Sequence, residues 1–226
     1  MSNTYGPRIV TDGLVLHLDA ANNRSYVSGS NTWNDLSGNG NNGTLIQGAS
    51  FNTSNNGSII FDGTNDAVTL ASKTYSFNGG TLEIWTKLTS KNRQQGFVGI
   101  NAPPKYLNFW MNTNNTMRWE VIGDTALTYS PISSTTIFST GVWYHATGTF
   151  TGALNSLYIN GVLETSSTTG AANVPTSITT TAYIGDYGAT AYPLAGNIAV
   201  VKLYNRALSR SEIFQNYNAT KGRFGL

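Results

Sequence analysis

The chain has no cysteine and little charge, and both absences limit what it can be. Without cysteine there is no disulfide framework, no thiol nucleophile and no thiolate metal site. Charged residues make up 11% of the 226 residues, well below the roughly 25% of an average soluble protein. With a formal net charge of +2 and basic residues scattered along most of the chain, the sequence predicts no nucleic-acid partner.

Long apolar runs and a leader segment are also missing from the sequence. No stretch approaches the roughly 18–20 consecutive apolar residues that a membrane-spanning helix requires. The first residues, 1–13, lack the charged-then-apolar order of a signal peptide. The sequence therefore predicts no membrane segment and, if Met1 is the true start, no export by the general secretory route.

What the chain does have is alternation of apolar and polar residues, which is typical of half-buried strands. Short joints rich in Gly, Asn, Ser and Thr separate these segments, as in sandwiches and jelly rolls. Asn160-Gly161 predicts a tight hairpin, because both residues tolerate positive φ. The predicted strands cover residues 14–19, 58–62, 67–71, 82–85, 96–100, 107–112, 117–122, 143–150, 156–160, 181–185 and 197–204.

One short helix is predicted near the C-terminus. Ser209-Arg-Ser-Glu212 has the spacing of a capping box, in which the Ser and Glu side chains bond reciprocally to the backbone of the first turn. Leu208 is expected to pack onto Ile213. With no repeat or linker, the predicted organisation is an N-terminal arm (1–11), one domain (12–219) and a C-terminal tail (220–226), both ends being flexible.

Several short motifs occur in an order that resembles a known family. They include Trp33-x-Asp35-x-Ser37-Gly38, Phe61-Asp62-Gly63, Trp143-x-His145 and Leu157-x-x-Asn160-Gly161. Together they resemble the laminin-G-like domains of the concanavalin A-like lectin/glucanase superfamily. The resemblance implies an all-β fold, a two-sheet antiparallel jelly-roll sandwich with one short C-terminal helix, and a structural role for His145. Members of this family mostly bind glycans or proteins.

Catalysis is not expected. The glucanases that share the fold carry a Glu-x-Asp-x-x-Glu strand, whose paired carboxylates perform retaining hydrolysis. That string is absent, and Glu120-Val-Ile-Gly-Asp124 is a near match that lacks the middle acid. The two histidines, His17 and His145, have no neighbouring metal ligands or nucleophile motif. A binding module is the first hypothesis, and a glycoside hydrolase is kept as an alternative.

Aromatic side chains suggest where a sugar would bind, since the apolar side of a sugar ring stacks on an aromatic face. Trp110 and Trp119 lie on adjoining predicted strands and are expected to approach each other on one sheet face. The loop 185–192 offers a second site with Tyr187, Tyr192 and Asp186. The alternative is that these tryptophans pack in the core, as most tryptophans of a sandwich do.

The loop 35–43 makes Ca²⁺ a candidate ligand. It supplies a carboxylate, amides and Gly-directed carbonyls, which are oxygen donors that calcium prefers. In related laminin-G-like domains a rim aspartate often holds calcium, and Asp35 matches that role, with Asp62 or Asp19 as a second carboxylate. The alternative is that Asp and Asn shape these turns through their own hydrogen bonds, with no ion.

The expected setting follows from the resemblance and the missing leader. A single module of this type is similar to surface proteins of tailed bacteriophages, so the expected location is the virion surface. There it would bind cell-surface or extracellular polysaccharide and attach to capsid or tail proteins. An extracellular fragment of a secreted protein fits equally. A purely structural assembly block without a glycan site, with a homo-oligomer as its usual form, is the competing function.

Overall fold

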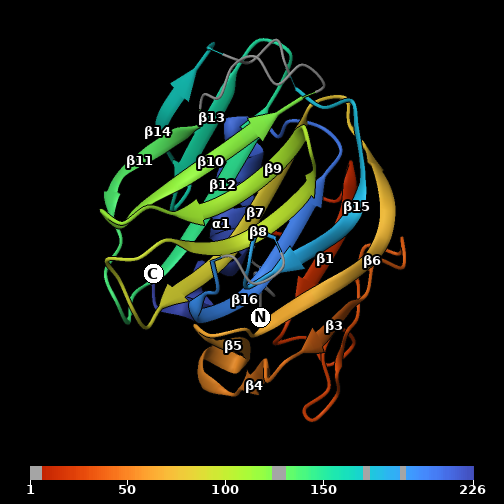
Figure 1. The fold of residues 1–226 in the computed structure, drawn as a ribbon, viewed down its shortest axis with the longest axis vertical. Coiled ribbons are helices and arrows are strands. Elements are labelled where there is room, and N and C mark those ends of the chain that lie inside the picture. Colours follow the sequence, from red (N-terminus) through yellow and green to blue (C-terminus); the bar gives the residue numbers. More distant parts are fainter. Residues whose placement is uncertain (1–6, 124–130, 170–173, 189–191) are drawn as a thin grey trace, which may run out of the picture.

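The computed structural model describes residues 7–123, 131–169, 174–188 and 192–226, and it shows two stacked antiparallel sheets (Figure 1). The predicted all-β jelly-roll sandwich is therefore confirmed. Sheet A has the order β14 (Val162–Ser167), β13 (Asn155–Ile159), β12 (Trp143–Phe150), β7 (Gly80–Leu88), β16 (Ala195–Tyr204), β5 (Ser58–Asp62) and β4 (Ser50–Asn52), and β1 (Leu14–Asp19) also pairs with β16.

Sheet B lies in front of sheet A in Figure 1. Its order is β11 (Ile132–Ile137), β10 (Thr116–Ile122), β9 (Lys105–Met111), β8 (Gln95–Ala102), β15 (Ser177–Ile184), β6 (Ala67–Ser76), β3 (Gly43–Ile46) and β2 (Thr32–Trp33). Some neighbours are consecutive strands, such as β8, β9, β10 and β11, whereas others, such as β7 and β16 or β8 and β15, are far apart in the sequence.

The main core fills the space between the two sheets. Strand alternation sends Leu107, Phe109 and Met111 of β9 inward, where they join Leu82 and Ile84 of β7 in one buried cluster. Each such side chain contributes about 1.5–3 kcal/mol through burial. The residues between them on each strand point to the outer face of their sheet.

A second, smaller core lies on the outer face of sheet A. There α1 (Arg210–Thr220) and the 3₁₀ helix η2 (Lys221–Phe224) cover the strands, and a further 3₁₀ turn, η1 (Ser54–Asn56), lies beside η2. The predicted capping box is confirmed, since Ser209 accepts from Glu212 N and the Glu212 carboxylate accepts from Ser209 N. Leu208 and Ile213 share one buried cluster.

The described residues near both ends of the chain contact the domain, and the flexibility of the ends stays a prediction. At the C-terminus the ring of Phe224 stacks on Trp85 with centroids 4.0 Å apart. Near the N-terminus Val10 N donates to Asn216 Oδ1 at 2.8 Å, which fastens the chain to α1. Val10 and Phe224 thus bury apolar surface in the two small clusters on the outer side of sheet A, which offsets part of the entropy lost on ordering the chain there. No helix in the described ranges is long or apolar enough to cross a membrane.

Candidate functional site

The register of β9 and β10 separates the two tryptophans that the sequence placed together. Trp119 is paired with Phe109, whereas Trp110 is paired with Arg118. Because Phe109 faces the core, Trp119 faces it too, and Trp110 points to the opposite, outer face of sheet B. The expectation that both indoles share one face is wrong, since the hairpin register differs by one residue from the one that would align them.

Trp119 belongs to the core and has no access to a ligand. Its side chain is 1% exposed, and its Nε1 donates to Thr149 O at 3.3 Å. Gly148 on β12 makes room for the indole, because a Cβ there would lie 2.3 Å from Trp119 Cδ2. The prediction of a sugar-binding role for Trp119 is therefore corrected to a packing role.

Trp110 instead supports an aromatic layer on the outer face of sheet B. The ring of Tyr187 stacks over it with centroids 6.1 Å apart, and Tyr192 stacks on Tyr187 at 4.8 Å with the planes 3° apart. The guanidinium of Arg118 lies 4.7 Å from the Trp110 ring centre. Trp110 itself is buried by this stack, so Tyr187 and Tyr192, which are partly exposed, form the surface of the layer. We call these three aromatic residues the outer aromatic cluster.

Two glycines of β8 allow the loop to lie so close to the sheet. A Cβ at Gly96 would come within 2.4 Å of Tyr187 N, and one at Gly99 within 2.4 Å of Tyr187 O. The backbone of the loop is then fastened by Gly96 N to Tyr192 O at 2.6 Å and by Asn101 Nδ2 to Tyr187 O at 2.5 Å. The position of the tyrosines is thus fixed by the sheet beneath them.

Asp186 holds the loop closed. It is 2% exposed, and its Oδ1 accepts from Tyr187 N at 2.6 Å and from Tyr192 N at 3.2 Å. A carboxylate that accepts two backbone N–H groups in this way fixes both tyrosines at once. Asp186 is therefore a positioning residue for the outer aromatic cluster, and the predicted direct contact with sugar does not follow from its burial.

Polar atoms beside the cluster lack partners in the part of the chain that the structure describes. Trp110 Nε1, Asn101 Oδ1 and Asn108 Oδ1 are buried atoms without a hydrogen bond there. An unsatisfied buried polar group costs about 1–3 kcal/mol, so these atoms call for a partner outside the protein, either water or a ligand hydroxyl. The sequence did not indicate a role for Asn101, because the hydrogen bonding of an amide side chain on a strand depends on neighbours that the sequence does not reveal.

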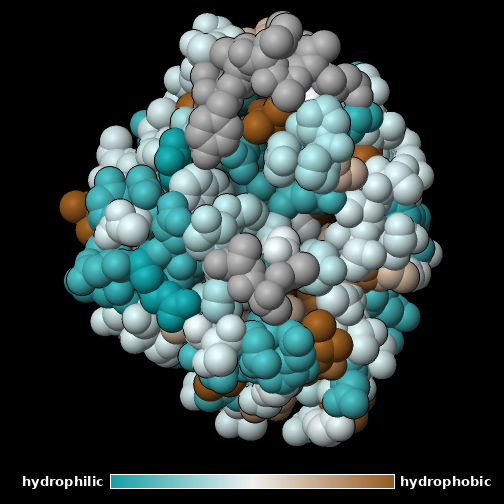
Figure 2. Space-filling view, viewed as in Figure 1, coloured by the Kyte–Doolittle hydropathy of each residue, from teal (hydrophilic) through white to brown (hydrophobic). Residues whose placement is uncertain are grey.

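Figure 2 views the outer face of sheet B in the orientation of Figure 1. Hydrophilic and intermediate residues predominate on it, with hydrophobic residues confined to small separate areas. On this face Asn108 Nδ2 donates to Glu120 Oε2 at 2.7 Å, which commits one oxygen of that carboxylate. Asp124, the second acid of the near match to a glucanase motif, lies outside the described residues.

The outer face of sheet A holds a buried ion network that the sequence did not predict. Lys202 Nζ lies 2.5 Å from Glu83 Oε1, His145 Nε2 lies 3.1 Å from the same oxygen, and Asn216 Nδ2 donates to Glu83 Oε2 at 2.8 Å. Burial alone would raise the pKa of Glu83, but Lys202 and His145 outweigh it and hold that pKa well below its usual range. Glu83, His145 and Lys202 are fully buried, so the network fastens α1 to the sheet and is closed to substrates.

The candidate metal ligands already have hydrogen-bond partners within the protein, and calcium at these residues stays a prediction. Among the described residues no three acidic or histidine side chains lie together in a way that could hold a metal ion. Asp35 accepts from His17 N and Ser37 N through Oδ1 and from Asn41 N through Oδ2. Asp62 accepts from Thr64 N, and Asp19 is paired with Arg223. These bonds are those of the turn-forming alternative, and the carboxylate oxygens keep lone pairs that a cation could use.

Comparison with known proteins decides the family. The family model described as the concanavalin A-like lectin/glucanases superfamily matches residues 62–214. The chain belongs to this superfamily. A search of the curated proteins gave no match. The resemblance deduced from the short motifs is thereby confirmed for the greater part of the chain.

Solved structures of similar fold include several binding domains. The binding domain of Paraclostridial Mosquitocidal Protein 1 has a TM-score of 0.73 at 19% identity, over 92% of this chain and 52% of that one. The receptor binding domain of botulinum neurotoxin D has a TM-score of 0.72 at 17% identity, over 92% and 52%. Trypanosoma rangeli sialidase has a TM-score of 0.68 at 18% identity, over 96% and 35%. The chain thus spans about half the length of the two toxin binding domains, and these similarities establish the fold.

Proposed function

We propose that the chain is a non-catalytic module that binds carbohydrate of a cell surface or an extracellular polysaccharide, with the outer aromatic cluster as its contact surface. Tyr192 is the outermost, partly exposed ring of the stack and offers the kind of apolar face on which a sugar ring stacks. The binding domains among the similar structures support a binding function in general terms.

The unpaired donor and acceptors beside the platform carry this proposal. Trp110 Nε1 is a donor and Asn101 Oδ1 an acceptor, and both are buried beneath the tyrosines, so in this proposal an internal water links them to a hydroxyl of the sugar. Stacking alone would attract any flat apolar ligand. The addition of unsatisfied polar atoms on the same face favours a ligand that has both an apolar side and hydroxyl groups, which is the chemistry of a sugar ring.

A hydrolase is disfavoured by the state of the buried acids. Glu83 is fully buried and paired with Lys202, and one oxygen of Glu120 is committed to Asn108. A retaining mechanism requires two carboxyl groups about 5–5.5 Å apart that face the substrate, and the sequence has no motif that places them so. The glycoside hydrolase alternative therefore has no support from the described residues.

A glycan array with affinity measurements tests the proposal. Tyr192→Ala removes the outer ring of the platform, and we expect it to weaken binding of the best array ligand about tenfold or more, which is about 1.4 kcal/mol. Phe214→Ala is the matched control, since this half-exposed aromatic residue lies on α1, away from sheet B. Equal affinity of Tyr192→Ala and the unaltered protein, with both folded, would refute the site.

The competing function, an assembly block, has one specific observation in its favour. Beside α1 and the β13–β14 turn is a groove of about 390 Å³ whose lining includes Phe214 and Val162, both half exposed. Exposed apolar side chains of this kind favour a protein partner. We predict that this partner is a phage capsid or tail protein, or a second copy of the chain. If Phe214→Ser is no longer incorporated into virions, or no longer associates with other copies of the chain, while its sugar binding is unchanged, the result would support this function.

The biological setting also stays a prediction. The virion surface and an extracellular fragment of a secreted protein are both compatible with a glycan-binding module. Detection of the protein in purified virions by mass spectrometry would support the first, and its presence only in culture medium free of virions would support the second.

A further inference from the structure

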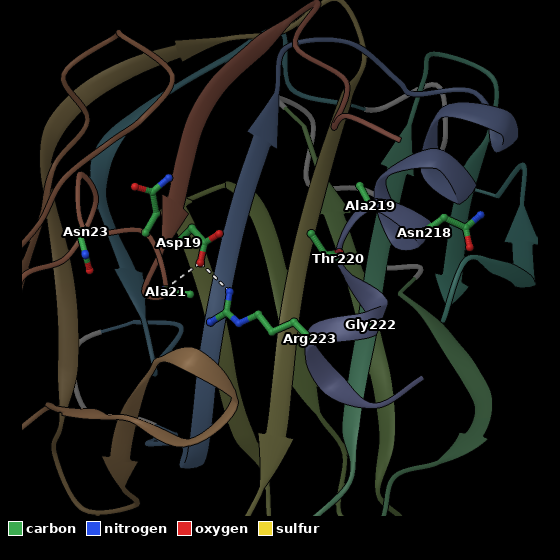
Figure 3. A pocket seen from close by; sticks show the side chains of 9 residues that line it. Asp19, Ala21, Asn23, Asn218, Ala219, Thr220, Gly222 and Arg223 are labelled. Atoms are coloured by element: carbon green, nitrogen blue, oxygen red, sulfur yellow. Dashed lines mark hydrogen bonds and ion pairs between the residues drawn. The ribbon is translucent and has the colours of Figure 1, made fainter. Parts of the chain in front are cut away.

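A polar groove on the outer side of sheet A is separate from the site proposed above. It has a volume of about 690 Å³ and lies between the end of β1 with the turn that follows and the end of α1 with η2 (Figure 3). Asp19, Asn22 and Asn23 line it from the first side, and Thr220, Gly222 and Arg223 line it from the second. The ion network of Glu83 lies beneath α1 and does not line this groove.

An ion pair fixes the groove. Arg223 Nη1 lies 2.6 Å from Asp19 Oδ1, and Figure 3 shows the two side chains reaching toward each other from β1 and η2. Asp19 Oδ1 also accepts from Ala21 N at 2.9 Å. Arg223 donates further to Asn55 O at 2.7 Å through Nε and to Gly57 O through Nη2. Both charged groups are thus held in place before any ligand arrives.

The lining selects a class of ligand by its chemistry. The described residues that line it are Asp, Ala, Asn, Thr, Gly and Arg, and none of them has a large apolar or aromatic side chain to attract an apolar ligand. The one carboxylate and the one guanidinium compensate each other, so the groove does not favour an anion or a cation. Amide groups both donate and accept hydrogen bonds, and Asp19 Oδ2 accepts none from the described residues.

We propose that this groove is a second ligand site, which binds the hydroxyl groups of a neutral sugar. Asp19 Oδ2 accepts from one hydroxyl while the exposed amide of Asn23 bonds to a neighbouring one. Because the groove lies on the outer side of sheet A and the outer aromatic cluster lies on that of sheet B, the two sites face away from each other. A module of this design joins two glycan chains. The groove site does not depend on the outer aromatic cluster.

Gly222 offers a way to block the groove without disturbing the fold. A Cβ on Gly222 meets no atom within 4 Å and its φ is not positive, so Gly222→Trp places an indole in open space at the groove wall. Gly152→Trp is the matched control, because Gly152 has the same freedom in the turn between β12 and β13. Asn23→Ala tests the same site without touching η2.

The experiment is a titration of the ¹⁵N-labelled chain with glucose, galactose and mannose, followed by amide chemical shifts, with acetate and ammonium as charged probes. With at least one sugar we expect the amide signals of residues 19–23 and 218–223 to shift in a saturable way, with a dissociation constant in the millimolar range. The affinity should be at least tenfold lower in Gly222→Trp, lower in Asn23→Ala and unchanged in Gly152→Trp. Tyr192→Ala leaves these shifts intact, which separates this site from the outer aromatic cluster. Absence of saturable shifts, their persistence in Gly222→Trp and Asn23→Ala, or saturation by the charged probes alone would overturn the proposal.

Discussion

The two outer faces of the sandwich carry similar residues, but these residues have different roles. On sheet A the indoles of Trp85 and Trp143 both have hydrogen-bond partners, Thr220 Oγ1 and Asn55 Oδ1, and α1 with η2 covers them. On sheet B the indole of Trp110 has no partner in the described residues, and its cover is a loop whose tyrosine rings are partly exposed.

The difference shows that residue type alone does not mark a binding site in this fold. A Trp, a Glu and an Asn stand on each outer face, and the tryptophans differ in whether the protein itself satisfies them. Where the helix supplies the partners, the face stabilises the fold. On sheet B the glycines of β8 are covered by a loop instead of a helix, and some buried polar atoms are left to bond with water or a ligand.

The largest expected effect is on the stability of sheet A. Lys202→Met removes the cation beside Glu83 and leaves a fully buried carboxylate without its charge partner, which typically costs about 3–5 kcal/mol. Chemical denaturation measures this change in the free energy of unfolding. Lys87→Met, at a partly exposed lysine over Trp143, is the control and is expected to cost less than about 1 kcal/mol. Equal costs for the two variants would show that α1 does not seal the network.

A pH effect of intermediate size is expected from His17 on the same sheet. Burial and the nearby Lys202 lower the pKa of His17 to about 4, whereas an unfolded histidine has a pKa of about 6.5. Since the unfolded chain takes up the proton first, the free energy of unfolding should fall by roughly 3 kcal/mol as the pH drops between these values.

His17→Gln isolates this contribution and should flatten the pH profile within that window. Glu83 affects stability in a more acidic pH range, because folding lowers its pKa below the ordinary value of a glutamate. Its stabilising contribution is present above the unfolded pKa of about 4.3 and disappears only at more acidic pH. A profile of His17→Gln that matches the unaltered protein would show that His17 is not responsible.

Calcium is expected to have the smallest effect. Because the oxygens of Asp35 already accept backbone N–H groups, the melting temperature with calcium should equal that with a chelator. A rise of several degrees with calcium, together with metal found by elemental analysis, would show that the loop rearranges to bind the ion.

The sequence predicted the elements better than the surfaces. Strands with strong alternation, such as β1 and β5, and the capped helix α1 were found because their patterns are local. The edge strands β11 and β14 were missed, since Ser and Thr dominate them and their pairing depends on the neighbouring strand. Lys202 is fully buried although lysine is rarely so, and its sequence neighbourhood does not indicate that α1 folds back over it.

The candidate site could be predicted only in part, because it depends on register and on a loop that folds over a strand. Tyr187 and Tyr192 were found from a loop without alternation, and the structure brings them together. The pairing of Trp110 with Arg118 depends on a hairpin register, which alternation leaves open by one residue. Nothing in the sequence around Gly96 and Gly99 indicates that the loop containing Tyr187 packs against them.

The indole N–H signals of the ¹⁵N-labelled protein test the central claim most directly. They report each tryptophan separately, and Trp110→Phe assigns the one on sheet B. On titration with the best ligand of the glycan array, the Trp110 signal should shift while those of Trp143 and Trp119, whose Nε1 groups already have protein partners, stay in place. A saturated complex in which the Trp110 signal does not move, or in which the Trp143 signal moves instead, would contradict the account.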